Sequence, residues 1–387
     1  MLYVRIRKRN EFVCHAKIRL MKKLKRKEYK TNKWNITRNS KFWLVLSIGI
    51  IGILGVLILK YGTASTYSIS LETENGLKSN IVDCQDSQAS QGECVQFGKS
   101  TSLGESIFDQ ACSKQLNYTV SGTVSSASAG LDEISGVVVS RKQNDVYWVN
   151  EDSGDSARVI ALNSKGAVIG RFTLTGSGVS AYDYEDLGMG PGPVDGQDYL
   201  YIADIGDNNA VRSTIKIYRI PEPNANINGG TKSVSADSIT LKYPDGAHNA
   251  ESYFVNPKDG YWYIIQKTTN GASKIYKVNG RGLATGSTAT LIDTGVHFQK
   301  GSSKPFQETT SADMSPDGST IIIRTYQAYY IYDSRNKTVE TALSGAPCIG
   351  PAISEGQGEA VGFKPNNRGY VSISEGTNQK INNIDMR

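Results

Sequence analysis

The sequence has 387 residues and a formal net charge of +6, from 43 Lys and Arg against 37 Asp and Glu. The net positive charge is confined to residues 1–41, which hold 15 basic and 2 acidic residues. The remainder holds 28 basic and 35 acidic ones and is net negative. This distribution excludes a uniformly basic nucleic-acid-binding chain, and we expect no nucleic-acid partner. A basic block beside an apolar segment more commonly fixes membrane orientation and contacts anionic lipids.

The apolar segment is residues 42–59, which carry no charged side chain. A helix of this length spans about 27 Å, close to the roughly 30 Å hydrocarbon core of a bilayer. Trp43 and Tyr61 stand at its ends, where aromatic rings favour the interface. The sequence therefore predicts a single-pass protein of the cell membrane, with residues 1–41 as a cytosolic tail and the C-terminal part outside the cytoplasm.

Two alternatives stay open for the N-terminal region. Small residues ending at Ala64 resemble a signal-peptidase site, although the apolar run is long for a signal peptide. Translation starting at Met21, which opens a Lys-rich run, is the second alternative. Neither affects the reading of the later chain.

Residues 60–112 are rich in Ser, Thr, Gln, Asn and Gly and show no sustained periodicity, which predicts a polar stalk. Four cysteines lie beyond the apolar segment, and an even count outside the cytoplasm permits two disulfides in three connectivities. We predict the pairs Cys84–Cys94 and Cys112–Cys348.

Residues 113–387 have the composition of an all-β domain, with short Val-, Ile-, Tyr- and Trp-rich runs between Gly-containing turns. A degenerate frame of Glu followed six residues later by Pro recurs five times. The five copies begin at Glu133, Glu185, Glu251, Thr310 and Glu359. Each copy is followed by further strands, with fourth strands expected at 288–292 and 338–343 in the third and fourth copies. Four strands repeated around a ring describe the blades of a β-propeller.

The last repeat has room for only three strands. Residues 116–124, just upstream of the first repeat, are expected to supply its fourth strand and so to remove two open edges. We therefore predict a five-bladed propeller closed by an N-terminal strand. Six blades is the alternative, if a long second or third repeat contains a further blade. The predicted Cys112–Cys348 bridge would join the closing strand to the blade that it completes.

A resemblance to a known group rests on three stretches. They are Tyr-Asp-Tyr-Glu-Asp-Leu at 182–187, Tyr-Leu-Tyr-Ile-Ala-Asp-Ile-Gly-Asp-Asn at 199–208 and Ile-Tyr-Arg-Ile-Pro-Glu-Pro at 217–223. With the Ser-Pro-Asp-Gly turn at 315–318, they resemble exported bacterial propellers of the TolB-like and of the phytase-like or esterase-like kinds. The resemblance covers roughly 130–376 and implies fold and compartment, without a firm activity.

The innermost strands of a propeller line its channel, so a residue repeated at their start forms a ring of side chains. We expect charged groups from these positions, and from the ends of the next strands, to line the channel or to bind a ligand. These residues are Glu133, Asp152, Glu185, Asp186, Glu251, Lys267, Arg324, Glu359 and Glu375. Facing carboxylates raise one another's pKa unless cations intervene. The simplest interpretation is a network of salt bridges that fixes the register of the blades.

Ca²⁺ is the possible cofactor, because oxygen-only ligands such as Asp204, Asp207 and Asn208 suit it better than they suit transition metals. The favoured function is a membrane-anchored binding or scaffolding module for an unidentified extracytoplasmic ligand or protein. The alternative is a Ca²⁺-dependent propeller hydrolase acting on a phosphoester or an ester. No Gly-x-Ser-x-Gly nucleophile motif occurs in the sequence, so the binding role is preferred.

Overall fold

The computed structural model describes residues 105–125, 130–269, 272–298 and 308–387. Outside these ranges it gives only the backbone of five short strands: β1 (Tyr3–Ile6), β2 (Cys14–Lys17), β3 (Ile69–Ser70), β4 (Ile81–Gln85) and β5 (Glu93–Phe97). The chain divides into two compact units, Met1–Thr101 and Ser102–Arg387.

The predicted transmembrane segment at 42–59 lies outside the described residues, as does the cytosolic tail apart from β1 and β2. Among the helices that the structure describes, none is both long and apolar enough to cross a bilayer. Strands β4 and β5 pair antiparallel with Cys84 opposite Cys94, but their side chains are not described. The membrane anchor and the Cys84–Cys94 disulfide therefore stay predictions.

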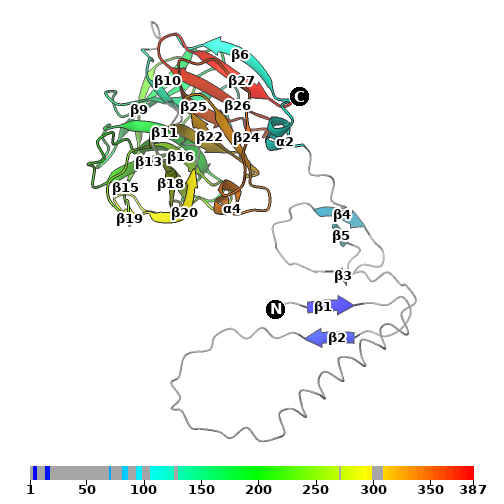
Figure 1. Ribbon diagram of the computed structural model, residues 1–387. Coiled ribbons are helices and arrows are strands. Elements are labelled where there is room, and N and C mark those ends of the chain that lie inside the picture. The colour runs from blue at the N-terminus through cyan, green and yellow to red at the C-terminus, as the bar shows by residue number, and fades with distance from the viewer. Residues whose placement is uncertain are drawn as a thin grey trace, which may run out of the picture. The chain divides into compact units, whose positions relative to one another are not determined.

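The second unit is a five-bladed β-propeller, as predicted (Figure 1). The first blade consists of β7 (Ile134–Val139), β8 (Tyr147–Glu151), β9 (Arg158–Leu162) and β10 (Val168–Thr175). The second consists of β11 (Tyr184–Pro191), β12 (Asp198–Asp204), β13 (Ile215–Pro221) and β15 (Asp237–Lys242). The third consists of β16 (Ala250–Val255), β17 (Trp262–Gln266), β18 (Ser273–Val278) and β20 (Ile292–Phe298).

The fourth blade consists of β21 (Thr309–Met314), β22 (Thr320–Thr325), β23 (Tyr329–Asp333) and the short β24 (Cys348–Ile349). The fifth consists of β25 (Gln357–Phe363), β26 (Gly369–Glu375), β27 (Lys380–Asp385) and β6 (Asn117–Thr123). Two further strands add to the outer edges of the first two blades. Strand β14 (Thr231–Ser235) pairs parallel with β10, and β19 (Thr288–Thr290) pairs parallel with β15. Both cover an edge that would otherwise expose unpaired backbone groups.

The closure of the ring confirms the sequence prediction. Strand β6 pairs antiparallel with β27, with Asn117 opposite Asp385 and Thr123 opposite Lys380. Figure 1 shows this N-terminal strand beside the C-terminal one. The predicted Cys112–Cys348 disulfide is present and joins two cysteines 236 positions apart in the sequence. It ties the segment just before β6 to β24 of the fourth blade.

The short helix α2 (Ile107–Cys112) precedes the closing strand and packs on the propeller. Ser106 and Asp109 form a capping box at its start, which satisfies otherwise unpaired backbone N–H groups. Ile107 and Ala111 are buried in an apolar cluster with side chains of the last two blades. The propeller unit therefore includes residues that the sequence analysis assigned to the stalk.

Two predicted fourth strands differ from the structure. Residues 338–343, expected as a strand, contain the helix α4 (Val339–Leu343), because the Thr338 side chain caps it by accepting from the Thr341 N–H. Strand β24 is the fourth strand of that blade instead. Residues 288–292 were expected in the third blade, but β19 joins the second blade and β20 completes the third.

The core lies between neighbouring blades rather than in one central mass. The inner strands β7, β16 and β21 are buried along their whole length, because each has blades on both faces. Large aromatic side chains fill the spaces between blades. The Tyr201 ring of the second blade, for example, meets the Trp262 ring of the third edge-on at 5.2 Å.

Removal of the ring-closing disulfide tests how much it contributes. We expect Cys112→Ser with Cys348→Ser to lower the free energy of unfolding by roughly 2–5 kcal/mol, because the bridge restricts a long loop in the unfolded chain. Urea unfolding of the full-length protein measures this difference. Addition of a reductant to the wild type should reproduce it, and coincident curves for wild type and variant would contradict the expectation.

Candidate functional site

One position of each innermost strand forms a β-bulge, where the pairing register skips a residue. The skipped residues are Ser135, Glu185, Glu251, Thr310 and Glu359. Because a bulge leaves its extra residue outside the ladder, it re-aims that side chain. Four of these positions are the first residues of the predicted repeat frame.

The first blade departs from the predicted frame. Its bulge is at Ser135, two residues after Glu133, which the sequence analysis placed in the ring. Glu133 is exposed and precedes β7, and its backbone N–H donates to Glu151 at 3.2 Å. Ser135 instead lies next to the second blade, with its hydroxyl 3.5 Å from Oε2 of Glu185.

Six carboxylates gather where the inner strands begin, and we call this group the acidic mouth. Its members are Asp152, Asp183, Glu185, Glu251, Glu359 and Glu375. Glu185, Glu251 and Glu359 are buried, with 2%, 5% and 5% of their surface exposed. Burial and the neighbouring Asp152 raise the pKa of Asp183 to about 6. Burial also raises the pKa of Glu251 to about 7, against the lowering effect of Lys267.

Lys267 is a cation that faces the mouth. It follows β17, forms an ion pair with Glu251 and donates to the Tyr326 hydroxyl at 2.7 Å. Burial alone would lower the pKa of Lys267, but Glu251 and Tyr326 raise it on balance, so the ammonium is retained. Its charge also lowers the pKa of Glu185 and Glu359, although burial keeps both raised overall.

Three members of the mouth lie especially close. Asp152 and the pair Asp183 and Glu185, from the first two blades, each offer a carboxylate oxygen within 4.8 Å of the others. A glycine leaves them this space: a Cβ at Gly206 would lie 2.2 Å from Oε1 of Glu185 and 2.4 Å from Oδ2 of Asp183. Asp183 was not singled out from the sequence, although it precedes Glu185 by only two positions.

Asp186 has a different role from its neighbour Glu185. Its Oδ2 accepts from the backbone N–H groups of Tyr253 and Ala312 at 2.9 and 3.0 Å. Its Oδ1 accepts from the Ser311 hydroxyl at 3.0 Å. Ser311 and Ala312 belong to the fourth blade, which is not adjacent to the second, so this carboxylate crosses the channel axis. Burial raises the pKa of Asp186, and these hydrogen bonds oppose that rise.

Arg324 lies between the fourth and fifth blades. It is 1% exposed and forms an ion pair with Glu355. Glu355 also accepts from Tyr329 and Ser372 at 2.8 Å each and from Asn382 at 2.7 Å. Burial raises the pKa of Glu355, but Arg324, Ser372 and Tyr329 lower it on balance. Glu355 lies outside the repeat frame, so this pair was not predicted from the sequence.

The residues expected to bind Ca²⁺ have partners within the protein. Asp204 forms an ion pair with Arg212 at 2.8 Å, and Asp207 accepts from the Arg212 backbone N–H at 2.7 Å. Asn208 accepts from the Asn249 amide at 3.1 Å. The guanidinium of Arg212, which was not among the predicted site residues, therefore lies against this group of oxygens. The predicted Ca²⁺ site at these three residues remains untested.

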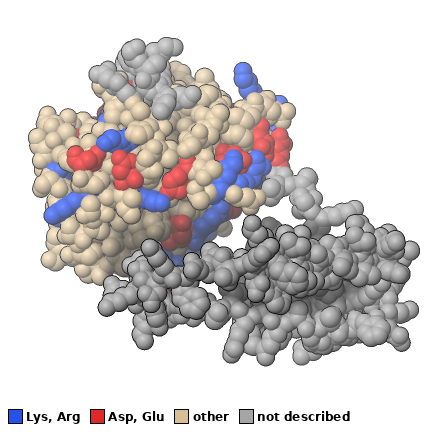
Figure 2. All heavy atoms as spheres, turned by 60° about the horizontal axis from the view of Figure 1, so that its bottom comes forward, with Lys and Arg blue, Asp and Glu red and all other residues tan. Residues whose placement is uncertain are grey.

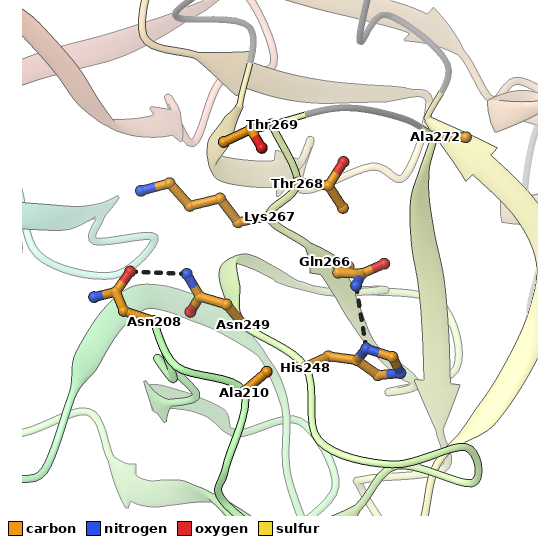
Figure 3. A pocket seen from close by; sticks show the side chains of 9 residues that line it. All are labelled: Asn208, Ala210, His248, Asn249, Gln266, Lys267, Thr268, Thr269 and Ala272. Carbon is orange, nitrogen blue, oxygen red and sulfur yellow. Dashed lines mark hydrogen bonds between the residues drawn. The ribbon is translucent and has the colours of Figure 1, made fainter.

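A cavity of about 530 Å³ lies between loops of the second and third blades. Figure 3 shows its lining, which is mostly amide and hydroxyl side chains, with Lys267 among them. Lys267 thus lines the cavity and also pairs with Glu251 of the acidic mouth. Acidic and basic side chains elsewhere lie side by side on the visible face of the propeller (Figure 2), which argues against a broad surface of one sign there.

Comparisons with known proteins assign neither a family nor an activity to this chain. No family model and no curated protein matches the sequence. A solved structure titled "Crystal structure of glucose dehydrogenase" is similar with 9% identity and a TM-score of 0.36, covering 70% of this chain and 100% of that one. Such a likeness gives no basis for assigning an activity. The resemblance to TolB-like, phytase-like or esterase-like propellers stays a prediction.

The Arg324–Glu355 pair yields a stability prediction. We expect Arg324→Ala to lower the free energy of unfolding by roughly 3–5 kcal/mol, because it strands a buried carboxylate. Arg281→Ala is the matched control, since Arg281 pairs with the 95% exposed Asp195, and such surface pairs contribute about 0–1 kcal/mol. Equal effects of the two substitutions in urea unfolding would contradict the assignment.

Asp183 yields a prediction about pH. Its pKa in the folded chain, about 6, exceeds the ordinary value of 3.8. Its contribution to stability is therefore complete below the ordinary value and is lost as the pH rises through about 6. Without divalent cations, we expect Asp183→Asn to lose less stability than the wild type between about pH 4 and pH 7. Urea unfolding across this range measures the difference, and parallel profiles would count against it.

Proposed function

We propose that this chain is a membrane-anchored propeller, displayed outside the cytoplasm, that binds an extracytoplasmic ligand at the acidic mouth with the help of Ca²⁺. The basic tail and the apolar segment at 42–59 support the anchoring and the orientation. The observation that carries the binding site is the close approach of Asp152, Asp183 and Glu185.

The donor set fits Ca²⁺ in three respects. The ligand atoms are all carboxylate oxygens, which hard cations prefer. Glu185 is only 2% exposed, and the hydrogen bond that it receives from Ser135 is long, at 3.5 Å. Gly206 leaves open the space beside Glu185 and Asp183 that a methyl group would occupy.

The electrostatics of the mouth favour a bound cation. Lys267 pairs with Glu251, and Arg212 lowers the pKa of Asp183, but burial and the neighbouring carboxylates still hold the pKa values of Asp183 and Glu185 above their ordinary range. Buried charges of one sign are costly without a partner. A divalent cation would offset this repulsion and present open coordination positions to a ligand in the channel.

We prefer the acidic mouth as the Ca²⁺ site to the group formed by Asp204, Asp207 and Asn208. Asp204 already has a full positive charge beside it, because Arg212 lies 2.8 Å away. A divalent cation there would have to displace or adjoin that guanidinium. Like charges at such short range repel strongly, so we propose the mouth as the preferred position.

The Ca²⁺-dependent hydrolase is a second candidate. It is favoured by the pKa values of Asp183 and Glu251, about 6 and about 7, which lie where a general base is effective. A phosphoester would also need cationic partners, and Lys267 is already engaged by Glu251. The binding role therefore takes first place.

Thermal unfolding of the full-length protein in Ca²⁺ and in EDTA tests the proposal. We expect saturating Ca²⁺ to raise the melting temperature by roughly 5 °C through mass action, and EDTA to reverse the rise. Asp183→Asn with Glu185→Gln should abolish the shift. Asp204→Asn with Asp207→Asn is the matched pair and should retain it.

The opposite pattern would assign Ca²⁺ to Asp204 and Asp207 instead. Absence of a shift in the wild type would refute the Ca²⁺ proposal. Gly206→Ala gives a finer test, because it keeps every carboxylate but puts a methyl group beside Glu185 and Asp183. It should weaken the shift caused by Ca²⁺.

A further inference from the structure

The cavity between the second and third blades has features of a small-molecule site that is separate from the proposed Ca²⁺ ligands. Its volume of about 530 Å³ falls within the roughly 300–1,000 Å³ typical of such sites. Asn208 comes from the loop after β12, Asn249 from the loop before β16, and Gln266 from the end of β17. Two neighbouring blades thus contribute to one lining.

The side-chain amide of Asn249 is held in one orientation. Its carbonyl oxygen accepts from the Asp207 backbone N–H at 2.8 Å, and its nitrogen donates to Oδ1 of Asn208 at 3.1 Å. Figure 3 shows the two side chains meeting at one side of the cavity. This pairing fixes which atoms are donors and which are acceptors.

The other side of the cavity is fixed in the same way. The Gln266 carbonyl accepts from the Lys274 backbone N–H at 3.4 Å, and its amide nitrogen lies 3.1 Å from Nδ1 of His248. Nε2 of His248 lies 3.0 Å from Oδ1 of Asp245, and its ring stacks on Tyr276 at 5.5 Å. Because these groups are ordered by the protein, a ligand would spend little of its binding energy on ordering them.

The chemistry of the lining selects the class of ligand. Among the described residues around the cavity, Lys267 is charged and is paired with Glu251, and none carries a carboxylate. The pairing of Lys267 with Glu251 offsets the charge that would attract an anion, and the described lining offers no carboxylate to attract a cation. Among the described lining residues, Ala210 and Ala272 have apolar side chains, so the groups that can orient a ligand are mainly amides and hydroxyls.

We propose that this cavity binds an uncharged saccharide. Sugar hydroxyls donate and accept hydrogen bonds at once, and amide side chains offer one donor group and one acceptor group each. Asn208, Asn249, Gln266 and the hydroxyls of Thr268 and Thr269 match such a ligand along the cavity. The saccharide site does not depend on Ca²⁺ at the mouth.

Calorimetric titration of the full-length chain in phosphatidylcholine nanodiscs, with EDTA present, tests the proposal. The probes are N,N′-diacetylchitobiose and cellobiose, with inorganic phosphate as an anionic comparison. We expect saturable binding of at least one disaccharide, weakened about tenfold in Asn249→Ala and in Gln266→Ala, since each removes hydrogen bonds to the ligand. Asn226→Ala, at an exposed position elsewhere, is the matched control and should bind as the wild type does.

Hydrogen exchange of the wild type gives a readout that does not depend on the variants. The bound disaccharide should protect backbone amides at 207–210 and 266–269. Binding of neither disaccharide, binding of phosphate alone, or protection confined to other segments would overturn the proposal. Because EDTA is present throughout, a failure here leaves the Ca²⁺ proposal standing, and a failure of the Ca²⁺ proposal leaves this one standing.

Discussion

The carboxylate of Asp186 is the interaction on which the arrangement of the propeller centre depends. It is fully buried and accepts hydrogen bonds from the third blade through Tyr253 and from the fourth through Ser311 and Ala312. One side chain of the second blade therefore fixes two others around the axis. Such a group holds its neighbours at defined positions, because loss of a partner would leave a buried polar group without one of its hydrogen bonds.

The position of Asp186 determines what lies above it. Glu185 is the bulged residue just before Asp186. The hydrogen bonds that join Asp186 to the other blades therefore also fix Glu185 at the start of the channel. Glu251 and Glu359 reach the same level from equivalent bulges. The rigid inner strands hold these carboxylates together although they repel, and Lys267 compensates only part of that repulsion. The proposed Ca²⁺ site follows from this constraint.

Much of the fold could be predicted from the sequence, because blade strands and turns are local patterns and the incomplete last repeat required a closing strand. The site could be predicted only in part. Glu133 was placed in the ring because it matches the repeat frame. The bulge of the first blade, which cannot be located from sequence, is at Ser135 instead. The pairing of Arg324 with Glu355 depends on contacts between blades. Residues 338–343 have a strand-like composition, and the helix there depends on a cap.

An anomalous diffraction map of crystals grown with Tb³⁺ in place of Ca²⁺ tests the central claim most directly, because the map locates the ion without relying on a variant. The account predicts a peak among the carboxylates of Asp152, Asp183 and Glu185. A peak beside Asp204 and Asp207, or no peak in the channel at saturating Tb³⁺, would contradict it.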